Sequence, residues 1–285
     1  MTVKAVFQGA FGAYSRLLPG ASAATARKLM TTPRLSNEVR VRATAMADET
    51  LALGADSWLS VRRGGDRVLL LVHGWSSGIG HFEALLAAFP RAIYTVYMVH
   101  PAGHGPSTAK RSHPGRFIDA IRLALAHIGE PVDVAIGHSM GAGALGFVAA
   151  HDGGIDRLVL VSGPATFEAV LRRFARFINL GPTAEQRFLA GMEAFVGLPL
   201  EALNIAALLG PVPVASLVVH DRSDREIPFA DSELLCGALQ HCEHLPTDGL
   251  GHNRILRDEA VIRRIADFAA GVDGLAGEGV QRVTA

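Results

Sequence analysis

The chain has no excess of either charge, because 27 Lys and Arg residues balance 27 Asp and Glu residues. This balance argues against a nucleic-acid binder, which needs a basic excess or patch to track phosphates. The chain also has no run of about 18 uninterrupted apolar residues, so no transmembrane helix is predicted. Cysteine is scarce, with only Cys236 and Cys242 present. With no cysteine framework around them, we expect two reduced thiols in a cytoplasmic protein rather than a disulfide or a metal pair.

Acidic residues are missing from the first 37 positions, where five basic side chains occur: Lys4, Arg16, Arg27, Lys28 and Arg34. Gly9, Gly12 and Arg16 interrupt anything like the core of a signal peptide. Two interpretations of residues 1–37 remain. The segment is either an amphipathic helical arm packed on its own domain, or a surface-seeking helix that contacts a membrane or a partner subunit. Composition favours the packed arm.

What the chain does have is apolar sequence, with 49% hydrophobic residues among 285. That supply suits an enzyme-sized core, in one large α/β domain or two ordinary ones. Residues 38–43 and 57–62 alternate in polarity and predict half-exposed strands. Arg67–Val72 is a continuous apolar run that is too short for a helix. We expect a strand buried on both faces, hence a mostly parallel sheet flanked by helices.

The most informative motif is Gly137-His138-Ser139-Met140-Gly141, which follows the apolar strand 132–136 and precedes a helix of small residues. Glycines on both sides of a serine allow a strained strand-to-helix turn that places the serine Oγ at its tip. The backbone N–H of Met140 can then face a developing oxyanion. The alternative is a glycine-rich turn in which Ser139 is only a helix N-cap.

Two loops are predicted at the same edge of the sheet. His73-Gly74-Trp75 follows strand 67–72, which makes the backbone N–H of Trp75 a candidate second oxyanion donor. The segment from His100 to Ser107 is rich in Gly and Pro and contains His104. Its histidines do not make a metal site, because three ligands of suitable geometry are not in evidence. We expect no metal and no cofactor.

Partners for Ser139 come later in the chain. Asp224 lies in the loop after the apolar strand 214–219, where a catalytic acid belongs, and Asp221 is a rival that could instead hold the loop by an Asx turn. His252 follows two glycines in Gly249-Leu250-Gly251-His252, so its loop can curl back toward the serine. The order Ser139, Asp224, His252, each after a strand, is the order of an α/β-hydrolase triad.

Strand–helix alternation stops between the sixth predicted strand, 158–161, and strand 214–219. Apolar residues over 166–209 recur at helical spacing, which predicts a helical lid whose phenylalanines line an apolar pocket or pack the lid on the body. The chain is therefore predicted to consist of an arm (1–37), a core (38–162 and 211–270), a lid (163–210) and a flexible tail (271–285).

With these residues assembled, positions 38–270 resemble the α/β-hydrolase superfamily, most closely its bacterial, lid-bearing, esterase-like members. The resemblance rests on His73-Gly74-Trp75, on Gly103-His104-Gly105-Pro106-Ser107, on the Ser139 turn, and on Asp224 and His252. Many relatives have an aspartate and a proline just before Gly-His-Gly, where this chain has His100 and Ala102. The hydrogen bonding of that loop is therefore open.

The resemblance and the residues together predict a serine hydrolase that cleaves an ester-type acyl bond through an acyl-enzyme, a carboxylesterase on a small or medium apolar acyl substrate. A thioesterase, an acyltransferase or a carbon–carbon hydrolase with the same triad is the alternative. A ligand-binding protein on a hydrolase fold is the non-enzymatic one.

Overall fold

The computed structural model describes residues 2–35, 46–271 and 281–282 of the chain. Its strands form one sheet in the order β1-β2-β4-β3-β5-β6-β7-β8-β9. The strands are β1 (Glu49–Leu53), β2 (Ser57–Arg62), β3 (Arg67–Val72), β4 (Tyr94–His100), β5 (Val134–His138), β6 (Arg157–Val161), β7 (Ala215–Asp221), β8 (His241–Thr247) and β9 (Gln281–Arg282). From β4 to β8 all neighbours run parallel, while β1, β2 and β9 join antiparallel at the two edges.

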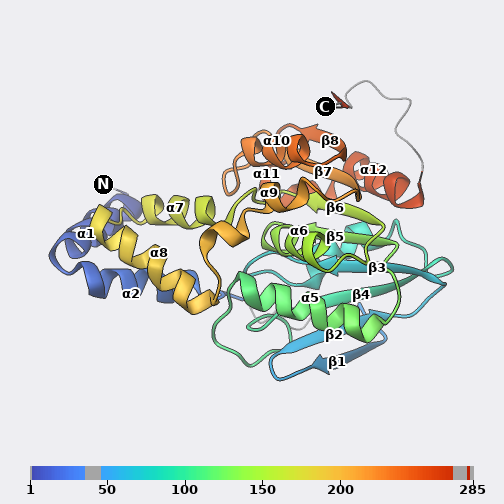
Figure 1. Cartoon of the computed structure of the whole chain (residues 1–285), viewed down its shortest axis with the longest axis horizontal. Helices are drawn as coiled ribbons and strands as arrows, with labels where there is room; N and C mark the ends of the chain where they lie inside the picture. Colours follow the sequence, from blue (N-terminus) through green and yellow to red (C-terminus); the bar gives the residue numbers. More distant parts are fainter. Residues whose placement is uncertain (1, 36–45, 272–280, 283–285) are drawn as a thin grey trace.

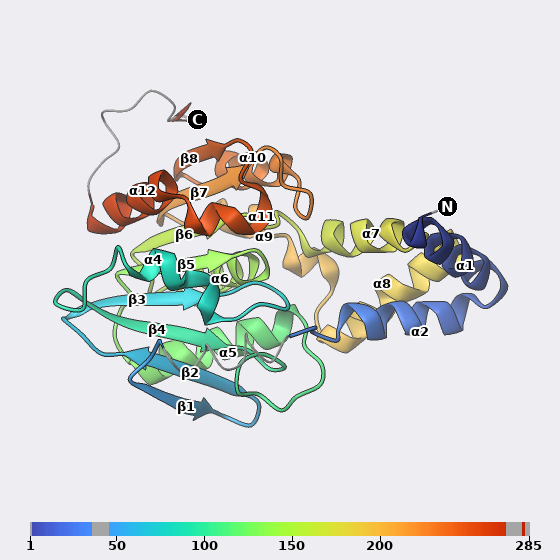
Figure 2. The ribbon, with the colours of Figure 1, turned by 180° about the vertical axis from the view of Figure 1, so that it is seen from behind.

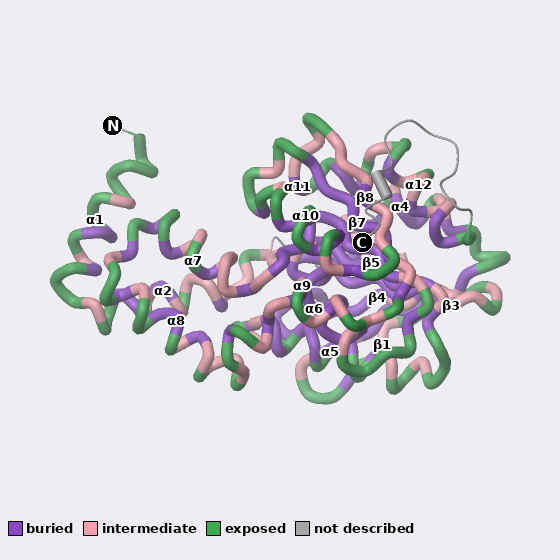
Figure 3. The backbone as a smooth tube through the Cα atoms, turned by 45° about the horizontal axis from the view of Figure 1, so that its top comes forward, coloured by how far each residue is buried: buried purple, intermediate pink, exposed green. Residues whose placement is uncertain are grey.

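Helices cover both faces of this sheet (Figures 1 and 2). One apolar cluster lies under α5 (Pro114–Ile128), α6 (Met140–His151), α9 (Ile205–Leu209) and α10 (Phe229–Ala238). The other lies under η1 (Ile79–Phe82), α4 (Glu83–Leu86), η3 (Ile255–Arg257) and α12 (Glu259–Ala270). In Figure 3 the central strands are mostly buried. This burial explains why β3, β5 and β7 are apolar runs without alternation, and it confirms the predicted fold class.

Most predicted strands occur within a few residues of their expected positions. Residues 57–62 form β2 and residues 67–72 form β3, as predicted. The strand predicted over 38–43 lies outside the described residues. Of the predicted tail, the structure describes Gly271, which ends α12 with a positive φ of 81°, and β9, which pairs with β8.

Between β6 and β7 the chain forms α7 (Phe167–Phe177), α8 (Pro182–Val196), η2 (Leu200–Leu203) and α9. The N-terminal segment forms α1 (Val3–Leu17) and α2 (Pro19–Met30), and these lie beside α7 and α8 rather than on the sheet (Figures 1 and 2). Phe11 and Ala26 of the arm share an apolar cluster with Leu171 of α7 and Phe188 of α8. We call these four helices, α1, α2, α7 and α8, the cap.

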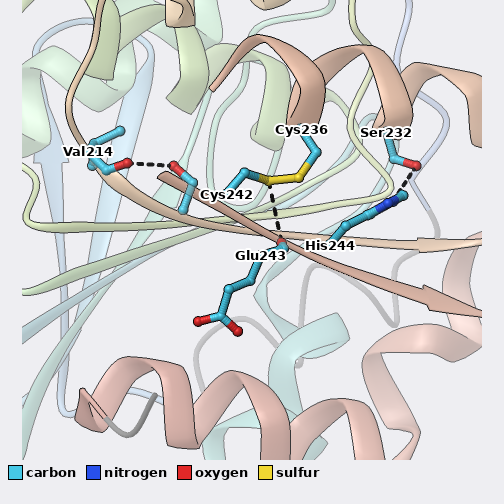
Figure 4. The surroundings of a disulfide bond; sticks show 7 residues. Val214, Ser232, Cys236, Cys242, Glu243 and His244 are labelled. Atoms are coloured by element: carbon cyan, nitrogen blue, oxygen red, sulfur yellow. Dashed lines mark hydrogen bonds between the residues drawn. A yellow bond between two sulfur atoms is a disulfide. The ribbon is translucent and has the colours of Figure 1, made fainter. Parts of the chain in front are cut away.

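The two cysteines correct one of our expectations. Cys236 near the end of α10 and Cys242 in β8 form a disulfide, with Cα atoms 5.5 Å apart (Figure 4). The short connection from α10 to β8 brings the two residues to the separation that a disulfide needs. The prediction of reduced thiols was therefore wrong, and the cytoplasmic location loses the support that those thiols gave it.

The described part of the chain has no helix that is both long enough and apolar enough to span a bilayer.

Candidate active site

Ser139 occupies the turn between β5 and α6 with φ 54° and ψ −120°, a conformation that costs energy for a residue other than glycine. A Cβ at Gly141 would collide with the backbone oxygens of Val72 and His73, and one at Gly137 would lie 2.6 Å from the Cα of Ala142. Only glycine fits at positions 137 and 141, because the neighbouring backbone lies too close for a Cβ atom. The Ser139 side chain makes no capping hydrogen bond to α6, all of which the structure describes. That observation speaks against the N-cap alternative.

Asp224 and His252 meet at the same edge. The Nδ1 of His252 lies 2.7 Å from Oδ2 of Asp224, and the Asp224 carboxylate is completely buried. Because a carboxylate can only accept, Nδ1 carries the ring proton and Nε2 is left as a base. His252 also lies beside the serine turn, since its carbonyl oxygen is 2.8 Å from Nε2 of His138, the residue that precedes Ser139.

The Asp224 carboxylate is held on both oxygens. Its Oδ1 accepts the backbone N–H groups of Glu226 and Ile227 at 2.8 and 3.0 Å. Burial alone would raise the pKa of Asp224, but the hydrogen bonds from His220 and His252 outweigh it and hold that pKa well below its usual range. Asp224 is therefore an anion at every physiological pH.

Asp221, the rival acid, has different partners. It is the last residue of β7, and its Oδ1 accepts from the backbone N–H of Ser223 at 2.9 Å. Its Oδ2 accepts from the hydroxyl of Thr247 at 2.8 Å and from the backbone N–H of Leu250 at 2.9 Å. Asp221 thus ties the loop after β7 to the loop that carries His252. The geometry pairs the imidazole with Asp224.

Two buried histidines that we did not single out support the pair. Nε2 of His220 lies 3.3 Å from Oδ2 of Asp224 and 3.0 Å from the carbonyl oxygen of Ile227, so it carries a proton and donates. His138 donates from Nε2 to the carbonyl of His252. Burial, with a further contribution from a charged His252, lowers the pKa of His138 to about 3, so it stays neutral. In the sequence, the only signal for them is that His138 precedes Ser139 and that His220 lies four residues before Asp224.

The loop after β3 approaches the serine closely. A Cβ on Gly74 would lie 3.0 Å from Cβ of Ser139, so only glycine fits there without a shift. This contact brings Trp75, the next residue, beside the turn. Met140 is the first residue of α6, and a backbone N–H in the first turn of a helix has no intrahelical acceptor. The structure thus brings both predicted oxyanion donors close to Ser139.

The Gly-His-Gly loop is closed by its own hydrogen bonds. The hydroxyl of Ser107 accepts the backbone N–H of Gly103 at 3.0 Å, and Nε2 of His104 accepts that of Ser76 at 3.1 Å. His100 hydrogen bonds to the Ser60 hydroxyl at 2.8 Å through Nε2, and burial lowers its pKa to about 3. His100 therefore has a serine partner on β2. Within the described ranges no three His, Cys, Asp or Glu side chains gather as metal ligands.

A narrow apolar cavity of about 10 Å³ lies next to Trp75 and Met140. Trp75 and Met140 line it from the body, Phe167 and Met192 from the insertion, and Met30 from the arm. This space holds about one water molecule, so the cap and the body are closed on each other. The arm also reaches the loop after β3, because the backbone N–H of Arg34 donates to the Ser76 hydroxyl at 2.9 Å. We had not foreseen a place for the arm at the site.

His252, although buried, also borders a second space. An open cleft of about 470 Å³ lies there, and it is lined by polar residues that include Ser223, Arg225, Asn253 and Arg254. Glu226 places a carboxylate oxygen 3.7 Å from Nε2 of His252. His252 thus lines an open cleft with polar walls, whereas Trp75 and Met140 line the apolar cavity.

Comparisons with known proteins agree with this fold. The family model for the alpha/beta hydrolase fold matches residues 67–220. A monoacylglycerol lipase from Mycolicibacterium smegmatis is 30% identical over 206 residues, covering 59% of this chain and 74% of that protein.

Solved structures extend the likeness of fold. A meta-cleavage product hydrolase from Pseudomonas fluorescens IP01 superposes with a TM-score of 0.60 at 14% identity, over 80% of this chain and 100% of that one. A thermophilic esterase from Thermogutta terrifontis superposes with a TM-score of 0.57 at 18% identity, over 78% of this chain and 97% of that one.

Proposed function

Because the chain belongs to the α/β-hydrolase family and is a hydrolase of that family, we propose that it is a serine hydrolase that cleaves an ester bond through an acyl-enzyme. Its proposed substrate is a small or medium apolar acyl ester. The single observation that carries the proposal is the buried Asp224–His252 hydrogen bond of 2.7 Å beside a serine held at positive φ.

The proposed reaction begins with proton transfer to His252. Its Nε2 takes the hydroxyl proton of Ser139 while Oγ attacks the acyl carbonyl, and the cation that forms is stabilised by Asp224. The imidazolium then gives its proton to the leaving alcohol as the ester bond breaks. A water molecule, deprotonated by Nε2, attacks the acyl-enzyme, and the proton returns to Ser139 as the acid leaves.

The tetrahedral intermediates would be stabilised by backbone donors. The N–H groups of Met140 and Trp75 point to this role through their positions at the start of α6 and after Gly74. Losing one such donor costs about 3 kcal/mol of transition-state stabilisation. No step in this scheme uses a metal or a cofactor.

The apolar cavity supports the acyl specificity. Its lining by Phe167, Val170, Leu171 and Met192 suits a hydrocarbon chain, and the name of the monoacylglycerol lipase relative agrees with such a substrate. Because the cavity holds about one water molecule, an acyl chain can enter only if the cap moves relative to the body. In this proposal α7 and α8 act as the lid.

A fluorophosphonate probe tests the nucleophile. We expect the wild-type protein to be labelled and the Ser139→Ala variant not to be. Ser162→Ala is the matched control, since Ser162 also follows a sheet strand at positive φ (49°) and is buried. Labelling that persists in Ser139→Ala, or that is lost in Ser162→Ala alone, would overturn the assignment.

A panel of acyl esters, thioesters, amides and carbon–carbon substrates tests the reaction class. Turnover of oxygen esters above the other classes is the expected result. Preferred turnover of a thioester or a carbon–carbon substrate would keep the triad and change the substrate class. Tight binding of small molecules without turnover of any kind would favour a ligand-binding protein.

A further inference from the structure

Helix α1 has two apolar faces, and only one of them is packed. Phe11, Gly12 and Ser15 are buried against the rest of the cap, where Ser15 Oγ accepts the backbone N–H of Gly181 at 2.9 Å. The opposite face carries apolar residues at helical spacing: Val3, Val6, Phe7, Ala10 and Leu17. All of these are exposed, and α1 is exposed over most of its length in Figure 3.

Exposed large apolar side chains concentrate at this tip of the molecule. Val3 is 88% exposed, Leu17 is 78% exposed and Phe177, at the end of α7, is 54% exposed. Six of the nine such side chains among the described residues belong to the tip: Val3, Val6, Phe7, Leu17, Leu18 and Phe177. The other three, Ile93, Leu123 and Leu234, are scattered singly over the body. A gathered apolar patch of this kind marks a binding surface, whereas scattered residues do not.

The charge around the patch has one sign. Helix α1 carries two basic residues, Lys4 and Arg16, and no acidic one. Lys4 lies over the ring of Phe177 at 5.1 Å, so a cation flanks the apolar stripe directly. Near the same end of α7, Arg176 is exposed. An apolar stripe bordered by cations complements a surface that offers both hydrocarbon and negative charge.

We propose that the tip of the cap docks on an anionic lipid membrane, with α1 lying in the interface and its exposed apolar face in the acyl region. The residues that insert are Val3, Val6, Phe7, Leu17 and Phe177, and the basic side chains contact anionic headgroups. This is peripheral attachment, because no described helix can span a bilayer.

A second copy of the chain fits this surface less well. Two copies that met stripe to stripe would bring Lys4 and Arg16 of one near those of the other, and like charges repel. A lipid surface has anionic groups at the positions where these side chains lie. The cap also connects the surface with the apolar cavity, since α2 ends at Met30 in the cavity wall.

Vesicle flotation with the full chain tests the proposal. Vesicles of phosphatidylcholine alone are compared with vesicles of equal parts phosphatidylcholine and phosphatidylglycerol. We expect binding to the anionic vesicles, weakened by high salt, and a roughly tenfold or greater loss of partition for Phe7→Ser/Leu17→Ser. Lys4→Gln/Arg16→Gln should lose roughly tenfold on anionic vesicles. The matched control is Leu123→Ser/Leu234→Ser, which removes two exposed leucines from the body and should bind like wild type.

Three results would overturn the proposal. They are no binding of wild type to either vesicle, equal losses in the tip and control variants, or a wild-type dimer in light scattering that Phe7→Ser/Leu17→Ser makes monomeric. The last result would assign the stripe to a second copy. Partition is independent of catalysis, and hydrolysis of a water-soluble short-chain ester should be unchanged in Phe7→Ser/Leu17→Ser. The docking and the proposed hydrolysis can therefore fail separately.

Discussion

The sheet edge around Ser139 and the cap above it are built in opposite ways. At the edge, the buried carboxylates are paired: both oxygens of Asp224 and both oxygens of Asp221 accept hydrogen bonds. The cap is held mainly by a small apolar cluster, with a few polar contacts such as the one from the Gln8 side chain to the carbonyl of Phe177. Apolar side chains of α1 are exposed on its outer side. We infer that the edge sets the chemistry and the cap sets what reaches it.

The largest effect should come from the acid of the proposed triad. Asp224→Asn keeps the shape but removes the anion that orients His252, so we expect kcat to fall by about 10³ to 10⁴. Asp221→Asn should lower the free energy of unfolding and change kcat much less than Asp224→Asn does, because Asp221 accepts hydrogen bonds from Thr247 and Leu250 and not from the imidazole. Steady-state kinetics on a short-chain ester, with urea unfolding of each variant, separate the two. A larger loss of kcat in Asp221→Asn would reverse the assignment.

A pair of glycine substitutions compares the two regions directly. A methyl group on Gly74 meets Cβ of Ser139 at 3.0 Å and Nδ1 of His138 at 3.1 Å, whereas one on Gly9 in α1 meets nothing within 4 Å. Gly74→Ala should therefore displace Trp75 and cost about 10² to 10³ in kcat. Gly9→Ala should leave kcat unchanged and favour the helix by about 1 kcal/mol. Equal kinetics for both variants would show that the serine turn accommodates the added methyl group without a loss of function.

Acid should destabilise the edge and spare the cap. Burial lowers the pKa of His73, His100 and His138 to about 3, against 6.5 for a free histidine. At a pH between these two pKa values, the histidines of the unfolded chain bind protons and those of the folded chain do not. The free energy of unfolding therefore falls as the pH drops. Each histidine should cost about 2 kcal/mol between pH 8 and pH 5. The four cap helices contain no histidine.

The free energy of unfolding, measured at pH 8 and at pH 5, tests whether the buried histidines cause this loss of stability. His100→Asn should lose about 2 kcal/mol less than wild type between pH 8 and pH 5. If the variant has the same pH dependence as wild type, the acid sensitivity does not arise from the buried histidines of the edge.

The smallest effect should be on selectivity. Met192 of α8 lines the apolar cavity, so Met192→Ala should enlarge it and raise the ratio of kcat/KM for a long ester over a short one by up to about tenfold. Leu180→Ala truncates the apolar cluster of the cap away from the cavity and should leave that ratio unchanged. The same change of ratio in both variants would mean that cap stability, and not the cavity wall, controls selectivity.

The two regions also differ in how far the sequence predicts them. Glycine spacing around Ser139 and the apolar run of β3 are local signals, because backbone strain and strand burial are written in consecutive residues. The preference for Asp224 over Asp221 also came from position in the chain, and the hydrogen bonds agree with it.

The contacts of the cap are not local. Nothing in the spacing of Phe11 or Ala26 indicates that their partners are Leu171 and Phe188, because which apolar faces meet is decided by the whole fold. The prediction of two reduced cysteines failed for a related reason. We argued from cysteine number and compartment, whereas the short connection between α10 and β8 decided the distance.

The central claim is that Ser139 carries the acyl group during turnover. Rapid acid quenching of the wild-type protein with a slowly deacylated ester, followed by digestion and mass spectrometry, tests it most directly. We predict one acyl mass increment on the peptide that contains Ser139, and none on that peptide in Ser139→Ala. Turnover without an increment at Ser139, or an increment on another residue that persists in Ser139→Ala, would contradict the account.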